Sequence, residues 1–190
     1  FTTDPSIKEL PDAKGKRLFY LERSFSINAF LDALLAAYGM TRDDLEMVGI
    51  GSHTEGKNAI IEGKTDLYFY TLTPWVEEVV RVKPLYGVEI PPAISKKIGE
   101  LAPGVSSGQW PAGQYGAKET TTQADWLFSL YVREGLDADL VYDILNVLYT
   151  RHDELVNTHR YFKLWTPDRG TMAISAEAHP GAVKFWKDKG

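Results

Sequence analysis

A turn rich in hydroxyl groups offers the clearest chemistry in this chain. Arg23, Ser24, Phe25 and Ser26 follow a short apolar run and open a segment with helical periodicity. The first N–H groups of a helix have no partner inside the helix, and the helix dipole makes that end positive. Together with the hydroxyls of Ser24 and Ser26 and the Arg23 guanidinium, these N–H groups are expected to form a site for a small anion. The alternative is that one serine only caps the helix and Arg23 is solvated.

A second turn of this kind contains Thr71 and Thr73, with Pro74 at the expected first position of a helix. A Thr–Pro pair is equally typical of a plain helix cap. Ligands of open α/β sheets bind at the carboxyl ends of the strands, so we expect both turns to face one crevice. The ligand-binding residues predicted from these two turns are Arg23, Ser24, Ser26, Thr71 and Thr73.

The loop that contains Trp110 and Tyr115 is a third candidate. It lies within a stretch rich in Gly, Pro and Ser at 102–118, and loops of that length inside a compact domain are commonly functional. We predict Tyr115 as a ligand-binding residue whose ring covers the solute. The competing interpretation is that both aromatic rings anchor the loop to the domain.

Nothing in the sequence forms a catalytic signature. Ser52 and His53 are adjacent, and adjacent side chains rarely point at each other; no Gly-x-Ser-x-Gly turn is present. His152 and His159 are seven residues apart, too far to hold one metal ion without further ligands. We therefore expect a protein that is not an enzyme and that uses no metal and no cofactor.

The composition narrows the class of protein further. The chain of 190 residues carries 21 Lys and Arg against 26 Asp and Glu, a net charge of −5, which argues against binding a phosphate backbone. There is no cysteine, which excludes disulfides and thiolate metal sites. No apolar run approaches the roughly 18 residues of a membrane helix. The sequence therefore predicts a globular protein that does not bind nucleic acid.

The elements that must position these groups alternate between strand and helix. Apolar runs at 17–21, 46–50 and 66–70 predict buried strands, each followed by a turn and a helical pattern. Residues 83–90 predict a fourth strand. Successive βα units predict a three-layer α/β lobe around a mostly parallel sheet.

After Pro91 the pattern changes. A short helix begins at 91–92, residues 102–118 are expected to be a loop, and the β-branched and aromatic residues of 120–132 predict a long strand. Helical periodicity then follows Asp137 and continues through Arg160, and Pro180 opens a short helix near the end of the chain.

Several pieces in a fixed order resemble one family. They are Asp12 to Arg17, Gly39 to Thr41 with Asp43 and Asp44, Glu62 to Asp66, Pro111 to Tyr115, Asp139 to Tyr142, and His179 to Trp186. In this order they resemble the TAXI type of extracytoplasmic solute receptor, which serves TRAP transporters. The resemblance extends over essentially the whole chain.

The resemblance implies a type II periplasmic-binding-protein fold, with two α/β lobes and a solute between them. Residues 1–16 would be a linker, 17–118 the second lobe, and 119–190 a return strand and C-terminal helices that pack on the hinge or first lobe. The family begins with a segment of the first lobe that is missing from this sequence. We expect that segment, which belongs to the same protein, to be a partner of this chain.

The same resemblance implies a periplasmic receptor that captures a small carboxylate or amino acid, glutamate-like, and passes it to membrane TRAP permease subunits. The family has a Gly-Ser-Gly-Thr-like turn where this chain has Arg23 to Ser26. The additional cation favours a more acidic solute.

Two other classes of function remain open. Bacterial transcription regulators use the same bilobed fold as a cytoplasmic effector-sensing domain. An enzyme on this scaffold would have to start from Ser24, His53 and Asp66, which no motif brings together.

Overall fold

The computed structural model describes residues 1–71, 75–159, 162–163, 165–166, 169–170 and 176–189. The chain forms two compact units, Phe1–Trp126 and Leu127–Gly190. The predicted boundary after residue 118 therefore lies inside the first unit. Within the described ranges, no helix combines the length and the apolar character needed to cross a bilayer.

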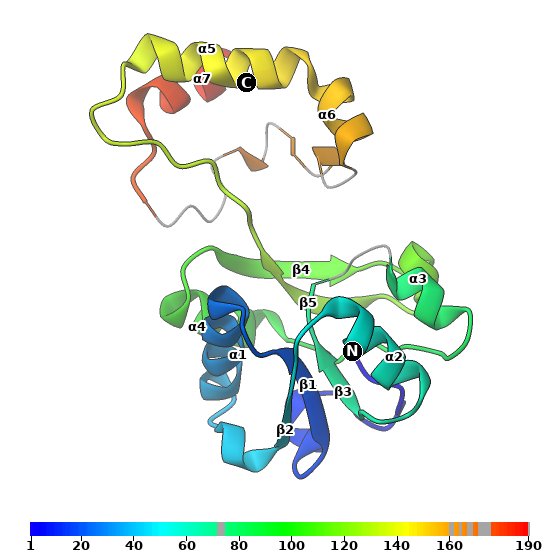
Figure 1. Ribbon diagram of the computed structural model, residues 1–190. Helices are drawn as coiled ribbons and strands as arrows, with labels where there is room; N and C mark the ends of the chain where they lie inside the picture. The colour runs from blue at the N-terminus through cyan, green and yellow to red at the C-terminus, as the bar shows by residue number, and fades with distance from the viewer. Residues whose placement is uncertain (72–74, 160–161, 164, 167–168, 171–175, 190) are drawn as a thin grey trace. The chain divides into compact units, whose positions relative to one another are not determined.

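A parallel three-stranded sheet is the centre of the first unit (Figure 1). Its order is β2-β1-β3, and both neighbours of the central strand run parallel to it. The strands are β1 (Arg17–Leu21), β2 (Glu46–Ile50) and β3 (Leu67–Phe69). The central strand is covered on both faces, which explains why its sequence is almost continuously apolar. The structure confirms the α/β class predicted from the sequence.

Helices cover both faces of this sheet (Figure 1). They are α1 (Phe25–Ala37), α2 (His53–Ile61), α3 (Trp75–Val80) and α4 (Pro92–Leu101). The side chains of α1 and α4 belong to one apolar cluster, and those of α2 and α3 to another. Gly39 and Gly63, both at positive φ, follow α1 and α2 and let the chain turn back toward the next strand.

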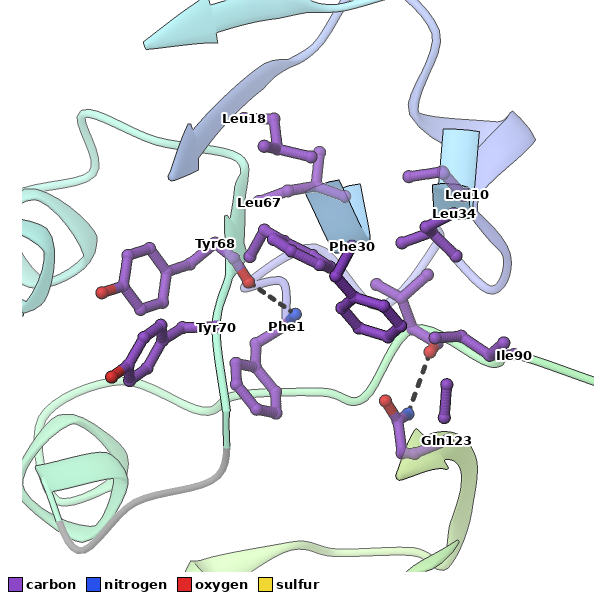
Figure 2. Close-up of a pocket in the computed structure, with 13 residues that line it drawn as sticks. Phe1, Leu10, Leu18, Phe30, Leu34, Leu67, Tyr68, Tyr70, Ile90 and Gln123 are labelled. Atoms are coloured by element: carbon purple, nitrogen blue, oxygen red, sulfur yellow. Dashed lines mark hydrogen bonds between the residues drawn. The ribbon is translucent and has the colours of Figure 1, made fainter. Parts of the chain in front are cut away.

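The two clusters follow the alternation of side chains along the strands. In β1, Leu18 and Tyr20 belong to the cluster with α1, whereas Phe19 belongs to the cluster with α2. Around β3, the rings of Tyr68 and Tyr70 extend to one side of the strand and Phe30 lies on the other (Figure 2). We call the side that α1 covers, where Phe30 lies, the α1 face of the sheet. The side that α2 covers, where the rings of Tyr68 and Tyr70 lie, is the α2 face.

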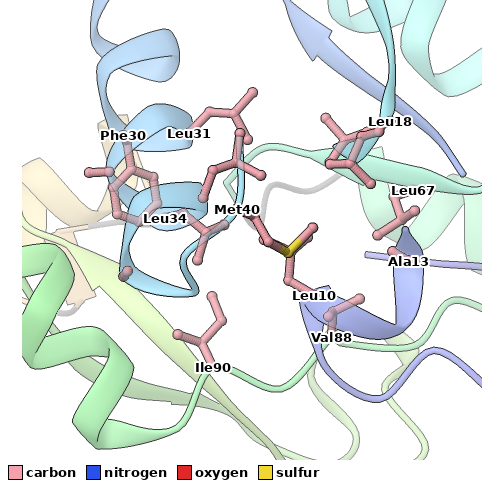
Figure 3. Close-up of a cluster of buried hydrophobic side chains, with 14 of the residues drawn as sticks. Leu10, Ala13, Leu18, Phe30, Leu31, Leu34, Met40, Leu67, Val88 and Ile90 are labelled. Carbon is pink, nitrogen blue, oxygen red and sulfur yellow. The ribbon is translucent and has the colours of Figure 1, made fainter. Parts of the chain in front are cut away.

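The α1 face holds the larger part of the core. Leucines and Phe30 from α1 point toward residues of β1 and β3, with Met40 among them (Figure 3). Residues 1–16, expected to be a linker, contribute to this core through Ile7, Leu10 and Ala13, which are all buried. Thr2 also bridges to Leu67 and to Tyr86, so this segment is an integral part of the unit.

Two strand predictions need correction. Residues 83–90 do not form a strand and make only isolated bridges at Tyr86 and Glu89. Inside the expected loop, β4 (Val105–Trp110) pairs antiparallel with β5 (Thr121–Trp126). The strand predicted over 120–132 ends at Trp126 because that residue already pairs with Val105, the first residue of β4.

The second unit has a small core of its own. It contains α5 (Ala138–Thr150), α6 (His152–Thr158) and α7 (Pro180–Lys189). Val141 and Leu145 from α5 meet the fully buried Phe185 of α7. A Cβ on Gly181 would lie 2.1 Å from the Ala138 carbonyl oxygen, so glycine is needed where the two helices approach. The His-Pro-Gly-Ala motif therefore has a packing role.

Candidate ligand-binding site at the carboxyl edge of the sheet

Three turns meet at one edge of the parallel sheet. Leu21 pairs with Ile50, and Tyr20 pairs with Phe69, so the strands β1, β2 and β3 end side by side. The turn after β1 contains Arg23 and Ser24, the turn after β2 contains Ser52, and Thr71 follows β3. The structure therefore brings Ser24 and Thr71 to the same edge. Thr73 lies outside the described residues.

The turn between β1 and α1 leaves the start of the helix open. Ser24 occupies the N-cap position, but among the described residues its side chain makes no capping hydrogen bond. Arg23 and Ser26 are exposed and Ser24 is half-buried. The first N–H groups of a 13-residue helix are thus directed to solvent, next to two hydroxyls and a guanidinium. This arrangement suits an anion.

The backbone of this turn is held by Asn28, one turn into α1. Its Nδ2 donates to the carbonyl oxygens of Leu21, Glu22 and Ser24, at 3.1, 3.0 and 2.8 Å. These contacts direct the carbonyl groups toward the helix side of the turn. Asn28 therefore fixes the shape of the turn without itself occupying the open helix end.

Arg42 in turn holds Asn28. Its Nη2 donates to Asn28 Oδ1 at 2.8 Å, and its Nε donates to Asp32 Oδ1 at 2.7 Å. The guanidinium also lies 5.1 Å from the centroid of the Tyr20 ring. The hydrogen bond to Asp32 raises the pKa of Arg42 further, so the group stays charged. Sequence reasoning missed both Asn28 and Arg42, and an asparagine four residues after an N-cap serine was the only local signal.

At the start of α2, by contrast, side chains already accept hydrogen bonds from the backbone N–H groups. Ser52 Oγ accepts a hydrogen bond from the Glu55 N–H at 3.2 Å, and Glu55 Oε2 accepts one from the Gly51 N–H at 2.8 Å. The Glu55 carboxylate adds a negative charge at the end of the helix where an anion would bind. The two helix starts therefore differ, and the start of α1 is the one suited to an anion.

The geometry of Ser52 and His53 does not suit nucleophilic catalysis. The Ser52 hydroxyl is engaged as the helix cap, and the His53 ring lies against Tyr70 with centroids 4.2 Å apart. Burial lowers the pKa of His53, which keeps the imidazole neutral. Across the described part of the chain, no three acidic, histidine or cysteine groups are arranged to hold a metal ion.

Tyr115 lies on the α2 face of the sheet. It belongs to a short 3₁₀ turn, Gln114–Gly116, and its ring packs against the cluster that contains Trp110 and the helices α2 and α3. The Trp110 Nε1 donates to the Gln114 carbonyl oxygen at 2.8 Å, which ties the loop to β4. These contacts anchor the loop, and the predicted contact of Tyr115 with a ligand stays a prediction.

Comparison with known proteins gives two findings. A model described as the NMT1-like family matches residues 1–190. Among solved structures, a periplasmic sulfonate-binding protein of a sulfonate ABC transporter, SsuA from Methylobacillus flagellatus KT, is 25% identical with a TM-score of 0.32. That match covers 35% of this chain and 20% of the other, so the chain spans about a fifth of that protein's length.

Proposed function

We propose that this chain, which belongs to the NMT1-like family, binds a small anionic solute as part of an extracytoplasmic solute receptor. In this proposal its first unit, which is built on a parallel α/β sheet, is one lobe of a periplasmic-binding-protein fold. In this proposal the protein captures its solute for a membrane transporter and does not transform it.

One observation supports this function more than any other: α1 begins without a side-chain cap at the carboxyl edge of a parallel sheet. The N–H groups of its first turn, with Ser24, Ser26 and Arg23, would donate to one anionic head group. The half-buried Thr71 would add a hydroxyl from the neighbouring turn. We further propose contributions from Thr73 and Tyr115 to the same site.

The narrower assignment is also a proposal. Carboxylates match the spacing of neighbouring N–H and O–H donors, and the exposed Arg23 favours a second acidic group, as in succinate or glutamate. The motif order described above supports a TAXI-type receptor that hands its solute to TRAP permease subunits. A periplasmic location follows from that function.

The test is isothermal titration calorimetry with succinate, L-glutamate and acetate. We expect the diacids to bind more tightly than acetate, and the double variant Ser24→Ala/Ser26→Ala to weaken succinate binding at least about tenfold, since each hydrogen bond to a charged group contributes roughly 1.5–3 kcal/mol. Ser52→Ala is the matched control, because it removes a hydroxyl from the adjacent, capped turn. Equal losses in both variants, or no binding of any anion, would contradict the proposal.

A further inference from the structure

A cavity of about 80 Å³ lies beside β3 in the first unit and is lined by residues from both faces of the sheet (Figure 2). Side chains from α1, β3 and β5 and from the segment before α4 line most of it. Those used below are Phe30 and Leu34 from α1, Phe69 from β3, and Gln123 and Ala124 from β5. The lining is mostly apolar, so the cavity suits a hydrocarbon group better than a polar one.

The residues that line the cavity differ in how far they are buried. Leu18 and Leu67 line its inner end and are fully buried. Phe69, Gln123 and Ala124 line its outer end and are only half-buried. Phe69 is the last residue of β3, so this outer end lies toward the carboxyl edge of the sheet, where the anion site was located.

The spacing along α1 connects the cavity to that site. Phe30 is five residues after Phe25, the first residue of the helix. At about 1.5 Å per residue, the Cα atom of Phe30 lies roughly 7–8 Å along the axis from that of Phe25, and its side chain leans back toward the start of the helix, which shortens the distance to the ring. This axial distance is about the length of a chain of five or six carbons. A solute held by its carboxylate at Ser24 could therefore place its hydrocarbon end beside Phe30.

Ring contacts and a hydrogen bond hold the side chains at the outer end of the cavity in place. The Phe30 ring lies 5.4 Å from the Phe69 ring and 5.6 Å from the Trp126 ring, measured between centroids. Gln123 Nε2 donates to the Val88 carbonyl oxygen at 2.9 Å, which holds its amide nitrogen at the wall. Phe1, Tyr68 and Tyr70 also line the cavity; the rings of both tyrosines point away from Phe30, and the Phe1 amino group donates to the Tyr68 carbonyl oxygen at 3.0 Å (Figure 2).

We propose that the cavity accepts the hydrocarbon part of the bound solute, which is therefore an amphiphilic carboxylate with an alkyl group of about four to six carbons. This inference rests on the proposed function, because it needs the carboxylate to be held at the start of α1. It adds a second recognition element, in which the head group selects for charge and the cavity selects for chain length.

The test is the affinity of the unmodified protein for the n-alkanoates from acetate to octanoate, measured by calorimetry. Each methylene that enters the cavity is expected to tighten binding about fourfold. The gain should stop once the cavity is full, near hexanoate. The Ala124 methyl signal in NMR spectra should shift with hexanoate and remain unchanged with acetate.

Two variants with the same added volume sharpen the test. Ala124→Leu places a larger side chain in the cavity wall, and should remove the gain from butyrate to hexanoate while leaving acetate binding unchanged. Ala93→Leu adds the same side chain at an exposed position of α4 and should behave like the unmodified protein. The chain-length series needs no variant, so it decides the question even if Ala124→Leu fails to fold.

The outcomes separate this inference from the proposed function. If acetate shifts the amide signals of Ser24 to Ser26 and longer alkanoates bind no better, the cavity inference is wrong and the anion site stands. If hexanol binds as tightly as hexanoate, the link between the two elements is wrong. If succinate binds and no alkanoate does, the cavity inference alone is wrong, and if neither succinate nor any alkanoate binds, both proposals are wrong.

Discussion

Replacing Asn28 with alanine perturbs the candidate site most selectively. The substitution removes three contacts to the carbonyl groups of the turn, at 3.1, 3.0 and 2.8 Å, and the 2.8 Å contact from Arg42. One amide has two N–H bonds, so the three carbonyl contacts correspond to about two hydrogen bonds, and the contact from Arg42 adds a third, at roughly 1 kcal/mol each. Alanine regains about 0.5 kcal/mol in helix propensity. The expected loss in the free energy of unfolding is therefore about 2.5 kcal/mol.

Urea denaturation measures this loss, and succinate titration measures its effect on the site. Because the turn would then have to be ordered on binding, at about 1 kcal/mol or more for each residue fixed, succinate affinity should fall about tenfold. Asn58→Ala is the matched control, since Asn58 is an exposed asparagine in α2, and it should be neutral or slightly stabilising. The reasoning is refuted if Asn28→Ala is as stable as Asn58→Ala, or binds succinate as the unmodified protein does.

Three further predictions concern stability. Arg17 holds the Asp66 carboxylate at 3.0 Å and lowers its pKa, so this pair stabilises the fold above the ordinary pKa of Asp, and the stabilisation is lost as the pH falls through the lowered pKa. Asp66→Asn should therefore cost about 1 kcal/mol at pH 7 and less at pH 2 in urea titrations; an equal cost at both pH values would contradict this. Gly56→Ala should destabilise by about 1–3 kcal/mol despite a better helix propensity, because the new Cβ would lie 2.6 Å from Ile50 Cδ1 and 2.7 Å from the Tyr68 ring; a rise in Tm would count against it. Phe185→Ala should cost about 3–5 kcal/mol in the second unit, seen as faster hydrogen exchange in α5 and α7, and unchanged exchange there would disprove the packing argument.

The central strand of the parallel sheet was predictable from sequence because burial on both faces leaves a nearly continuous apolar run. The apolar runs of β1 and β2 coincide with the predicted ranges 17–21 and 46–50. Residues 83–90 gave the same signal, and Leu85, Val88 and Ile90 are indeed buried. Pro84 lacks an N–H group, however, and Gly87 lies so close to Thr121 that a Cβ would be 2.8 Å from Oγ1. Apolar burial there does not require a strand.

The strand β4 was missed for the opposite reason. Its middle, Ser106 to Gln109, contains small and polar residues with weak strand propensity. Pairing with β5 over six residue pairs stabilises it, and that pairing depends on tertiary structure.

In the candidate site, too, some features follow from the local sequence, whereas others depend on contacts between distant residues. The hydroxyl-rich turns at Ser24 and Thr71 are local features, and their shared edge follows from the parallel strands. The network that shapes the first turn joins Asn28 to Arg42, 14 residues apart, and no periodicity indicates such a contact. The difference between the open start of α1 and the closed start of α2 also depends on side-chain geometry, since both turns contain serine.

Mapping the bound anion on the backbone tests the central claim most directly. Succinate titrated into ¹⁵N-labelled protein should shift the amide signals of Ser24, Phe25, Ser26 and Ile27 in a saturable manner, and leave those of His53 and Thr54 at the start of α2 unchanged. Saturable shifts confined to α2, or to neither helix start, would contradict the account.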